Sequence, residues 1–512
     1  MNATTSPRQI FRCKGYVLYS IIVSLGGFLN GYDTGSIGAV TEMPSFKTTI
    51  RDLSPTMQGF TVALIMLMGA VPGILAGGLA DRFGHLRIVI SGALTFTIGA
   101  ALQAGSRTLS TFLVGRALAG IGQGLWITNV SVYITEIAPS AQRGKLVSIA
   151  QFMAAVGICS GYFTCYGSIH IGSDLSFRLP FILQAVVSLG FALSCLYLPM
   201  SPRWLLANGH RAEALDAIEC LEIPRAEAEK DILGPRQQSD ISKLGVAKAF
   251  FIIFRQEYRA RTMLAFFVLG AIQLCGIDGV LYYAPVLFAQ AGLPEGTASF
   301  LASGVSAILM LLISIPAFLY ADRWGRRASI ITGGILLSSC MFIIGGLYAS
   351  NVVHAHAGAG RWLVIILIFA FALSYCATWG VAGKIYASEI QPPQTRATTN
   401  SVAQGLNFFT NWLVAFSTPI FLAHSSYGAY FLFGGISLLS VTILAMHMPE
   451  TRGYSLEYIQ GGFQALATDS QGERRRIRKF LSAPVLPDPE LSHTNYIGQP
   501  ATGVMRIELT IV

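Results

Sequence analysis

The sequence is poor in charged residues. Of its 512 residues only 12% are charged and 53% are hydrophobic, whereas a soluble domain carries about 25% charged residues. This deficit, together with a positive mean hydropathy, excludes an ordinary soluble protein and indicates a chain that crosses a membrane several times. The net charge of +9 does not indicate a nucleic-acid partner, because most Lys and Arg residues fall in loops on one side of the predicted membrane.

Motifs for metal binding and catalysis are also missing from the sequence. The eight cysteines have no metal-ligand spacing and most lie within apolar segments, so we expect neither a zinc site nor a disulfide framework. The sequence has no nucleophile–base set and no phosphate-binding loop, so we expect neither an enzyme nor a cofactor. The first apolar run is too long for a signal peptide and lacks a small-residue cleavage site, so it is interpreted as a retained membrane helix.

Twelve apolar segments of roughly 20 residues are long enough to cross the ~30 Å hydrocarbon core of a bilayer. They lie near residues 15–40, 57–80, 88–106, 110–134, 145–167, 177–198, 261–291, 298–320, 328–349, 361–387, 397–423 and 427–448. We therefore predict an all-α polytopic membrane protein with two six-helix bundles. The predicted parts are a cytoplasmic N-terminus (1–14), an N-terminal bundle (15–198), a cytoplasmic helical linker (199–260), a C-terminal bundle (261–448) and a cytoplasmic tail (449–512).

Basic residues in the short loops predict the orientation of the chain. Arg87, Lys145 and Arg327 fall on one side, whereas few basic residues fall on the other. Because cytoplasmic loops are richer in Lys and Arg, both termini are expected in the cytoplasm. We expect the plasma membrane as the location. The basic run at 474–479 is interpreted as part of a solvated tail, with contact to anionic lipid as the alternative.

Two loop motifs occur twice in the chain, six helices apart. Residues 81–84 (DRFG) recur as 322–325 (DRWG), and Glu136…Arg143 recurs as Glu389…Arg396. Such repeats imply two halves related by duplication, with a site between them near the bilayer midplane. The acids and bases can form charge-assisted hydrogen bonds across the halves that lock one face shut; plain positive-inside topology is the alternative. The candidate gating residues are Asp81, Arg82, Glu136, Arg143, Arg203, Asp322, Arg323, Glu389, Arg396 and Glu450.

Further motifs appear in order along the chain: 31–35 (GYDTG), 115–116 (GR), 136–139 (EIAP), 201–205 (SPRWL), 282–285 (YYAP) and 449–453 (PETRG). With these motifs the chain resembles the sugar porter family of the major facilitator superfamily, in the style of fungal hexose transporters, from about Gly26 to Glu457. The resemblance implies that two rigid halves rock around one solute site. The chain departs from the family's gate motifs at His85, Leu86 and Met200.

Two ionisable residues fall inside predicted membrane helices, Asp33 in the first and Arg116 in the fourth. Charges at this depth are costly and indicate function. The resemblance implies that Asp33 takes up the transported proton and that Arg116 tunes it. The alternative is a permanent structural ion pair, since passive members of the family can also carry this aspartate.

The resemblance also implies a set of substrate-binding positions. These are Asn30, Gln151, Gln273, Asp278, Tyr282, Lys384, Asn407 and Asn411. Asp278 stands where the family usually has asparagine, and Lys384 where it has tryptophan. Because buried charges need partners, we consider three interpretations: the two residues pair across the cavity, they bind polar groups of the substrate, or Lys384 is misaligned. A free Lys384 would favour a carboxylate.

The predicted function is therefore transport of a monosaccharide, or a related sugar acid or polyol, by alternating access and proton symport. The expected partners are a small polar solute, protons and the lipid bilayer, and we expect a monomer. One alternative is a dedicated transporter of a small organic acid or secondary metabolite, indicated by Asp278 and Lys384. Another is a nutrient sensor that does not transport, but such sensors need a longer signalling tail than residues 449–512.

Overall fold

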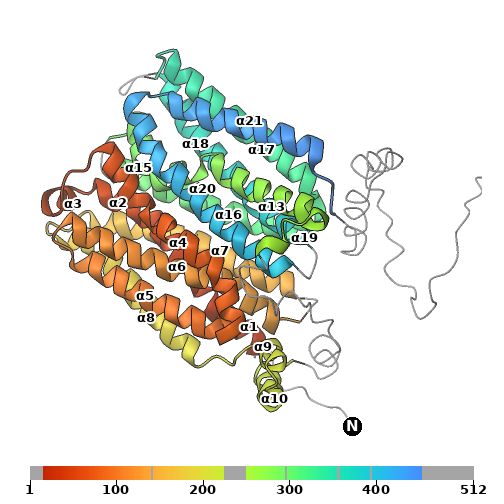
Figure 1. Cartoon of the computed structure of the whole chain (residues 1–512). Helices are drawn as coiled ribbons and strands as arrows, with labels where there is room; N and C mark the ends of the chain where they lie inside the picture. The colour runs from red at the N-terminus through yellow and green to blue at the C-terminus, as the bar shows by residue number, and fades with distance from the viewer. Residues whose placement is uncertain are drawn as a thin grey trace, which may run out of the picture.

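The computed structural model describes residues 15–139, 142–223, 250–294, 297–353, 358–391 and 395–452. Within these ranges the regular secondary structure is helical. Ten of the described helical segments are long and apolar enough to cross a membrane. The broken helix α1–α2 and the helix α6 run beside them and complete the predicted crossings (Figure 1). The all-α prediction is confirmed, while the N-terminal segment 1–14 and the basic run at 474–479 lie outside the described residues.

The first half of the chain forms one bundle, red to yellow in Figure 1. Its elements are α1 (Gly15–Val23), α2 (Leu25–Glu42), the short α3 (Pro44–Thr49), α4 (Pro55–Phe83), α5 (His85–Gly105), α6 (Leu109–Ile137), α7 (Arg143–Ser168) and α8 (Leu175–Leu196). Two short helices follow, α9 (Pro202–Ala207) and α10 (Arg211–Cys220). The described start of the predicted linker is therefore largely helical.

The second half forms the other bundle, green to blue in Figure 1. Its elements are α13 (Gln256–Leu274), α14 (Ile277–Tyr282), α15 (Ala284–Gln290), α16 (Thr297–Trp324), α17 (Arg326–Ala349), α18 (Ala359–Ala377), α19 (Trp379–Glu389), α20 (Arg396–His424) and α21 (Gly428–His447). Apolar side chains such as Val71, Val186 and Leu439 are exposed on the outside of the bundles, as expected where helices face lipid.

Small residues let α2 and α7 approach closely within the first bundle. A Cβ atom added at Gly27, Gly31 or Gly35 would lie within 2.3 Å of a carbonyl oxygen of α7. The glycines are four residues apart and share one face of α2. This is the small-residue packing by which membrane helices associate. This packing fixes the position of Asp33 along the helix axis, because Asp33 lies between the contacts at Gly31 and Gly35.

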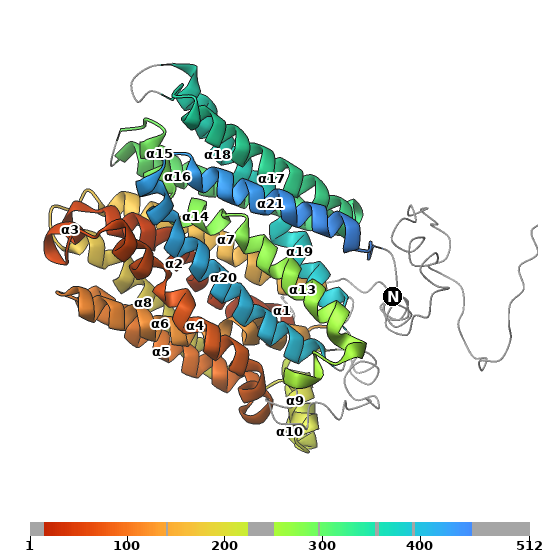
Figure 2. The same cartoon turned by 45° about the horizontal axis from the view of Figure 1, so that its top comes forward.

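Besides the break between α1 and α2, two further membrane segments that the sequence predicts as continuous helices are interrupted. The segment 261–291 divides into α13, α14 and α15 (Figure 2), and its first break is at Gly276, where φ is +91°. Glycine is favoured there because side chains with a Cβ rarely adopt positive φ. The segment 361–387 divides at Thr378, whose φ and ψ are −126° and −81°. Discontinuous helices are tolerated in membranes where they line a site, and these breaks directly precede the segments that carry Asp278 and Lys384.

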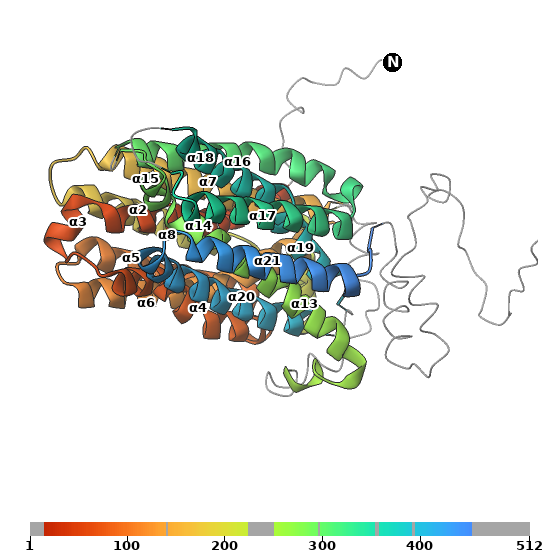
Figure 3. The same cartoon turned by 90° about the horizontal axis from the view of Figure 1, so that it is seen from above.

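The long helices run roughly parallel, with α3 at one end of the molecule (Figure 3). We call this the α3 end, and the opposite end, which carries α9 and α10, the α10 end. The halves meet through α4 with α20 and through α7 with α16, and near the α3 end α2 also contacts α14 and α15. Gly38 of α2 lies directly against the backbone carbonyl of Tyr282. The two halves are therefore closed together at the α3 end.

Candidate functional site

Asp33 and Arg116 form a fully buried ion pair in the first bundle. The Arg116 Nη1 atom donates to Asp33 Oδ1 at 2.7 Å, and both side chains are 0% exposed. Arg116 also donates to backbone carbonyls of α4, from Nε to Thr61 at 3.3 Å and from Nη2 to Val62 at 2.6 Å. The guanidinium is thus anchored to α4 independently of Asp33. The two residues, which lie in separate membrane helices of the sequence, are therefore in direct contact, and their role in proton coupling stays a prediction.

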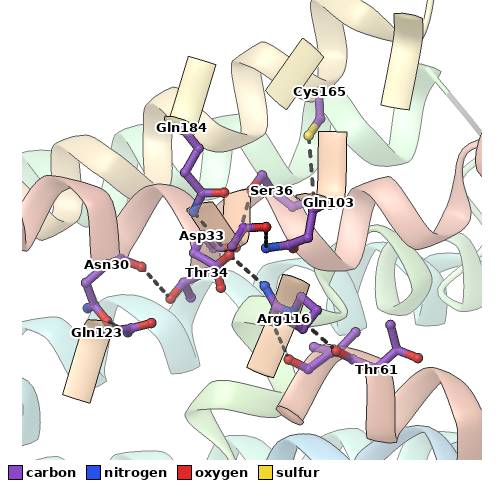
Figure 4. Close-up of polar contacts among 12 residues, drawn as sticks. Asn30, Asp33, Thr34, Ser36, Thr61, Gln103, Arg116, Gln123, Cys165 and Gln184 are labelled. Atoms are coloured by element: carbon purple, nitrogen blue, oxygen red, sulfur yellow. Dashed lines mark hydrogen bonds and ion pairs between the residues drawn. The ribbon is translucent and has the colours of Figure 1, made fainter. Parts of the chain in front are cut away.

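The two oxygens of Asp33 have different surroundings. Gln184 of α8 donates from Nε2 to the same Oδ1 atom, at 3.2 Å, so Oδ1 accepts two hydrogen bonds (Figure 4). The Oδ2 atom is buried and has no hydrogen-bond partner among the described residues. A proton can therefore bind at Oδ2 without first displacing either donor. Gln184 is not among the residues predicted from the sequence, although a glutamine within the apolar run 177–198 is a signal of a buried polar contact.

A second polar contact lies one helical turn from Asp33. Gln123 of α6 donates from Nε2 to Oδ1 of Asn30 (Figure 4). Asn30 precedes Asp33 by three residues in α2 and shares its face of the helix. Since α2 runs from the α10 end toward the α3 end, Asn30 lies on the α10 side of the ion pair. It separates Asp33 from the more open part of the interface.

The candidate substrate residues of the second bundle form a linked set. Gln273 of α13 donates from Nε2 to Asn407 Oδ1 at 3.5 Å, and its Oε1 accepts from the Tyr375 hydroxyl at 3.5 Å. Asp278 interacts with Asn411 of α20. Tyr375 was not expected from the sequence, because nothing in the apolar run 361–387 distinguishes it from packing aromatics.

Asp278 and Lys384 do not form a direct ion pair. The Lys384 ammonium donates instead to Gln151 Oε1 of α7, at 3.2 Å. Asp278 is 6% exposed and its Oδ2 atom has no hydrogen-bond partner among the described residues. The two charges do interact electrostatically. Lys384 lies within the regular helix α19.

Lys384 and Gln151 are both exposed, although they lie between the halves. Lys384 is five residues from the end of α19 and Gln151 is eight residues from the start of α7, which places them about 7 Å and 12 Å from those helix ends. Both of these helix ends are at the α10 end. Both side chains therefore lie nearer to the α10 end than to the α3 end.

Tyr282 lies at the α3 end, apart from Lys384 and Gln151. Its side chain is 1% exposed, and its backbone carbonyl contacts Gly38 of α2. The next residue, Tyr283, precedes the start of α15, and its hydroxyl donates to the Ala415 carbonyl at 2.9 Å. Tyr282 therefore belongs to the closed contact at the α3 end.

The candidate gating residues that the structure describes contact elements of their own half. His85 Nδ1 is 3.4 Å from Glu136 Oε2 in the first bundle, and Arg326 Nη2 is 3.0 Å from Glu389 Oε1 in the second. The sequence predicts bonds across the halves, whereas these contacts lie within a half. Their gating role stays a prediction.

Other candidate gating residues lie at the same end. Asp81 accepts at its backbone carbonyl from Trp204 Nε1 at 2.9 Å, Arg82 stacks over Phe83 at 5.2 Å, and Arg203 is partly buried in α9. The side chains of Arg143, Asp322, Arg323 and Arg396 lie outside the described residues.

The Glu450 carboxylate binds backbone N–H groups at the start of α17. Its Oε1 atom accepts from the backbone N–H groups of Arg326, Thr451 and Arg452 at 2.9–3.1 Å. Its Oε2 atom accepts from the backbone N–H of Arg327 at 3.1 Å. A carboxylate at a helix N-terminus satisfies orphan N–H groups and interacts favourably with the helix dipole. Glu450 therefore holds the end of the second bundle to α17.

Comparisons with known proteins agree with this architecture. The family model described as "Sugar (and other) transporter" matches residues 19–463. An arabinose-proton symporter of Bacillus subtilis is 28% identical, with 87% of this chain and 94% of that protein covered. A probable quinate permease of Aspergillus niger is 27% identical, with 90% and 89% covered.

A solved structure has the same fold. The partially occluded inward-open conformation of the xylose transporter XylE from E. coli superimposes with a TM-score of 0.68 and 25% identity, covering 86% of this chain and 99% of that chain. The described helices and the buried polar residues between the halves fit that architecture. The chain therefore belongs to the sugar (and other) transporter family, and it is a multi-pass membrane transporter rather than an enzyme.

Proposed function

We propose that this chain moves a monosaccharide, or a related sugar acid or polyol, across the membrane together with a proton. The observation that carries the proposal is the buried pair of Asp33 and Arg116, with one carboxylate oxygen left without a partner. The relatives that couple sugar transport to protons support it, since an arabinose-proton symporter covers nearly the whole chain. A purely structural ion pair would have no need of an unsatisfied oxygen.

Protonation of Asp33 changes what holds α2 in place. The neutral carboxyl no longer attracts the guanidinium as an ion, and Arg116 keeps its two carbonyl partners on α4. Because Arg116 stays bound to α4, protonation weakens the attachment of α2 to α6 and releases α2. At its far end α2 contacts α14 at Tyr282. A proton bound at Asp33 thus changes the stability of the contact that closes the α3 end, as a local charge change biases a two-state element.

The solute occupies the space between Gln151 of the first half and Gln273, Asp278 and Asn407 of the second. Groups from both halves then contact it, so its binding favours closure of the α10 end. In the closed state we expect the acids and bases there, including Glu136 and Glu389, to bond across the halves. We further propose that the protein works as a monomer in the plasma membrane, with both termini and the linker in the cytoplasm.

The test is solute accumulation in vesicles that contain the purified protein. An inward proton gradient is imposed, and uptake of radiolabelled xylose, arabinose, gluconate and quinate is measured. Asp33→Asn is expected to abolish accumulation above equilibrium while solute exchange without a gradient continues. Asp174→Asn, an exposed aspartate paired with Arg178, is the matched control and is expected to accumulate solute normally. If no wild-type uptake responds to the gradient, the proposal of proton coupling is wrong.

A further inference from the structure

Lys384 differs from the other cations that the structure describes inside the bundles. Arg116 lies 2.7 Å from a carboxylate oxygen and Arg326 lies 3.0 Å from one. Lys384 is within ion-pair distance of no carboxylate among the described residues, and its hydrogen-bond partner is the neutral amide of Gln151. An ammonium held by one amide keeps most of its capacity to bind an anion. Its side chain is exposed, although it bridges to the other half through Gln151.

The nearby polar groups of the second half have unused hydrogen-bonding capacity. Asp278 Oδ2, Asn407 Nδ2 and Asn411 Oδ1 have no hydrogen-bond partner among the described residues. Asp278 is 6% and Asn411 is 8% exposed. Buried polar atoms without partners are costly in a protein interior and call for an explanation. A ligand with several hydroxyl groups can donate to Asp278 Oδ2 and Asn411 Oδ1 and accept from Asn407 Nδ2.

The two observations together define a site with one cationic end and one hydroxyl-binding end. We propose that the solute is a polyhydroxylated carboxylate, a sugar acid or cyclic polyol acid, whose carboxylate binds the Lys384 ammonium. This rests on the proposed transport function and narrows its substrate class. A neutral sugar would leave the ammonium of Lys384 with only the longer-range attraction of Asp278 when the site closes and loses water, which is unfavourable for a buried charge. The similarity to a probable quinate permease supports the same class.

The site also connects solute binding to the relative position of the halves. The bond from Lys384 to Gln151 joins α19 of the second half to α7 of the first. A carboxylate is a stronger acceptor for an ammonium than an amide is. The carboxylate of the bound acid therefore replaces Gln151 as the acceptor for the Lys384 ammonium. The direct hydrogen bond between the halves is then replaced by a connection through the solute.

Charge balance gives a sharp experimental signature. One monovalent acid carried with one proton moves no net charge, whereas a neutral sugar carried with one proton moves one positive charge. The experiment uses vesicles with the purified full chain and compares gluconate with glucose and quinate with inositol. The expected result is that the two acids are taken up at least tenfold more efficiently than their neutral counterparts, and that their uptake does not respond to membrane potential.

Variants then assign the effect to Lys384. Lys384→Met is expected to reduce uptake of both acids about tenfold or more by raising KM, and Lys384→Arg is expected to restore most of it. The matched control is Lys47→Met. Lys47 lies on α3 and pairs with Glu42, so its removal should leave the ratio of acid uptake to neutral-solute uptake unchanged. Size-exclusion profiles and melting curves confirm that each variant is folded.

The failures of the two proposals are distinguishable. If glucose or inositol is driven by the proton gradient and the acids neither enter nor compete, the inference about Lys384 is overturned while the transport function stands. Normal acid uptake by Lys384→Met would overturn it as well. If none of the four probes responds to a proton gradient, the proposed function itself fails.

Discussion

Gln184 and Arg116 donate to the same oxygen of Asp33, at 3.2 Å and 2.7 Å, although they lie on α8 and α6. Both donors stabilise the charged form of the carboxylate. Their joint action on one oxygen leaves Asp33 Oδ2 without a partner among the described residues. If Asp33 carries the proton as we propose, Gln184 positions its carboxylate without carrying a charge itself.

We expect Gln184→Leu to weaken uptake driven by a proton gradient. The substitution removes one of the two donors that hold Asp33 Oδ1 in place, so the carboxylate is less well positioned on Arg116. A hydrogen bond to a charged group is worth about 1.5–3 kcal/mol, so we also expect a lower melting temperature. The measurements are initial uptake with and without an inward proton gradient, and melting curves in detergent.

The matched control for this prediction is Gln58→Leu. Gln58 also donates to a carboxylate, Glu42 Oε1 at 2.6 Å, but at the α3 end of the molecule and not at Asp33. Gradient-driven uptake by Gln58→Leu should be unchanged. Equal gradient-driven uptake by Gln184→Leu and the wild type would show that Gln184 has no part in proton coupling.

The second prediction concerns the two residues that depart from the family pattern. The double variant Lys384→Trp with Asp278→Asn restores the residues usual in sugar porters, and it removes both charges at once. We expect its preference to move from acids toward neutral monosaccharides, because the stacking surface returns and the ammonium is lost. The measurement is competition by acids and sugars against one labelled solute, with each single variant for comparison. A substrate profile equal to that of the parent contradicts the idea.

The third prediction concerns the packing of α2 on α7. A side chain at Gly31 would meet the Ala154 carbonyl at 1.9 Å, so Gly31→Val must push the two helices apart. Overpacking of this kind typically costs about 1–3 kcal/mol. We expect a lower melting temperature in detergent and weaker proton coupling, since Asp33 moves with α2. Gly190→Val is the control, because a Cβ there has open space around it; equal melting of the two variants would refute the packing argument.

The fourth prediction concerns the carboxylate at the start of α17. Glu450 accepts from four backbone N–H groups, and Glu450→Ala removes these contacts and the charge near the helix N-terminus. We expect a loss of about 1–3 kcal/mol in stability, read as a lower melting temperature. Glu219→Ala, at an exposed position of α10, should melt like the wild type. A thermal shift of the same size in both variants would argue against the role of Glu450.

The sequence by itself determined the class of this protein and most of its elements. Long apolar runs have no stable form in a bilayer other than helices, because every backbone group must be paired within the segment. The depth of Asp33 and Arg116 within such runs likewise indicated a buried functional pair, since an unpaired charge there is too costly to keep.

Only the tertiary structure decided which polar groups meet. Sequence spacing within one helix carries no information about the helix that packs against it, so neither the contact of Gln184 with Asp33 nor that of Lys384 with Gln151 could be read from the chain. The breaks at Gly276 and Thr378 were missed for a related reason. Apolar composition alone predicts a continuous helix, whereas the interruption depends on packing against neighbouring helices around a site. The bonding of Lys384 to an amide of the other half, in place of Asp278, is decided by that three-dimensional arrangement.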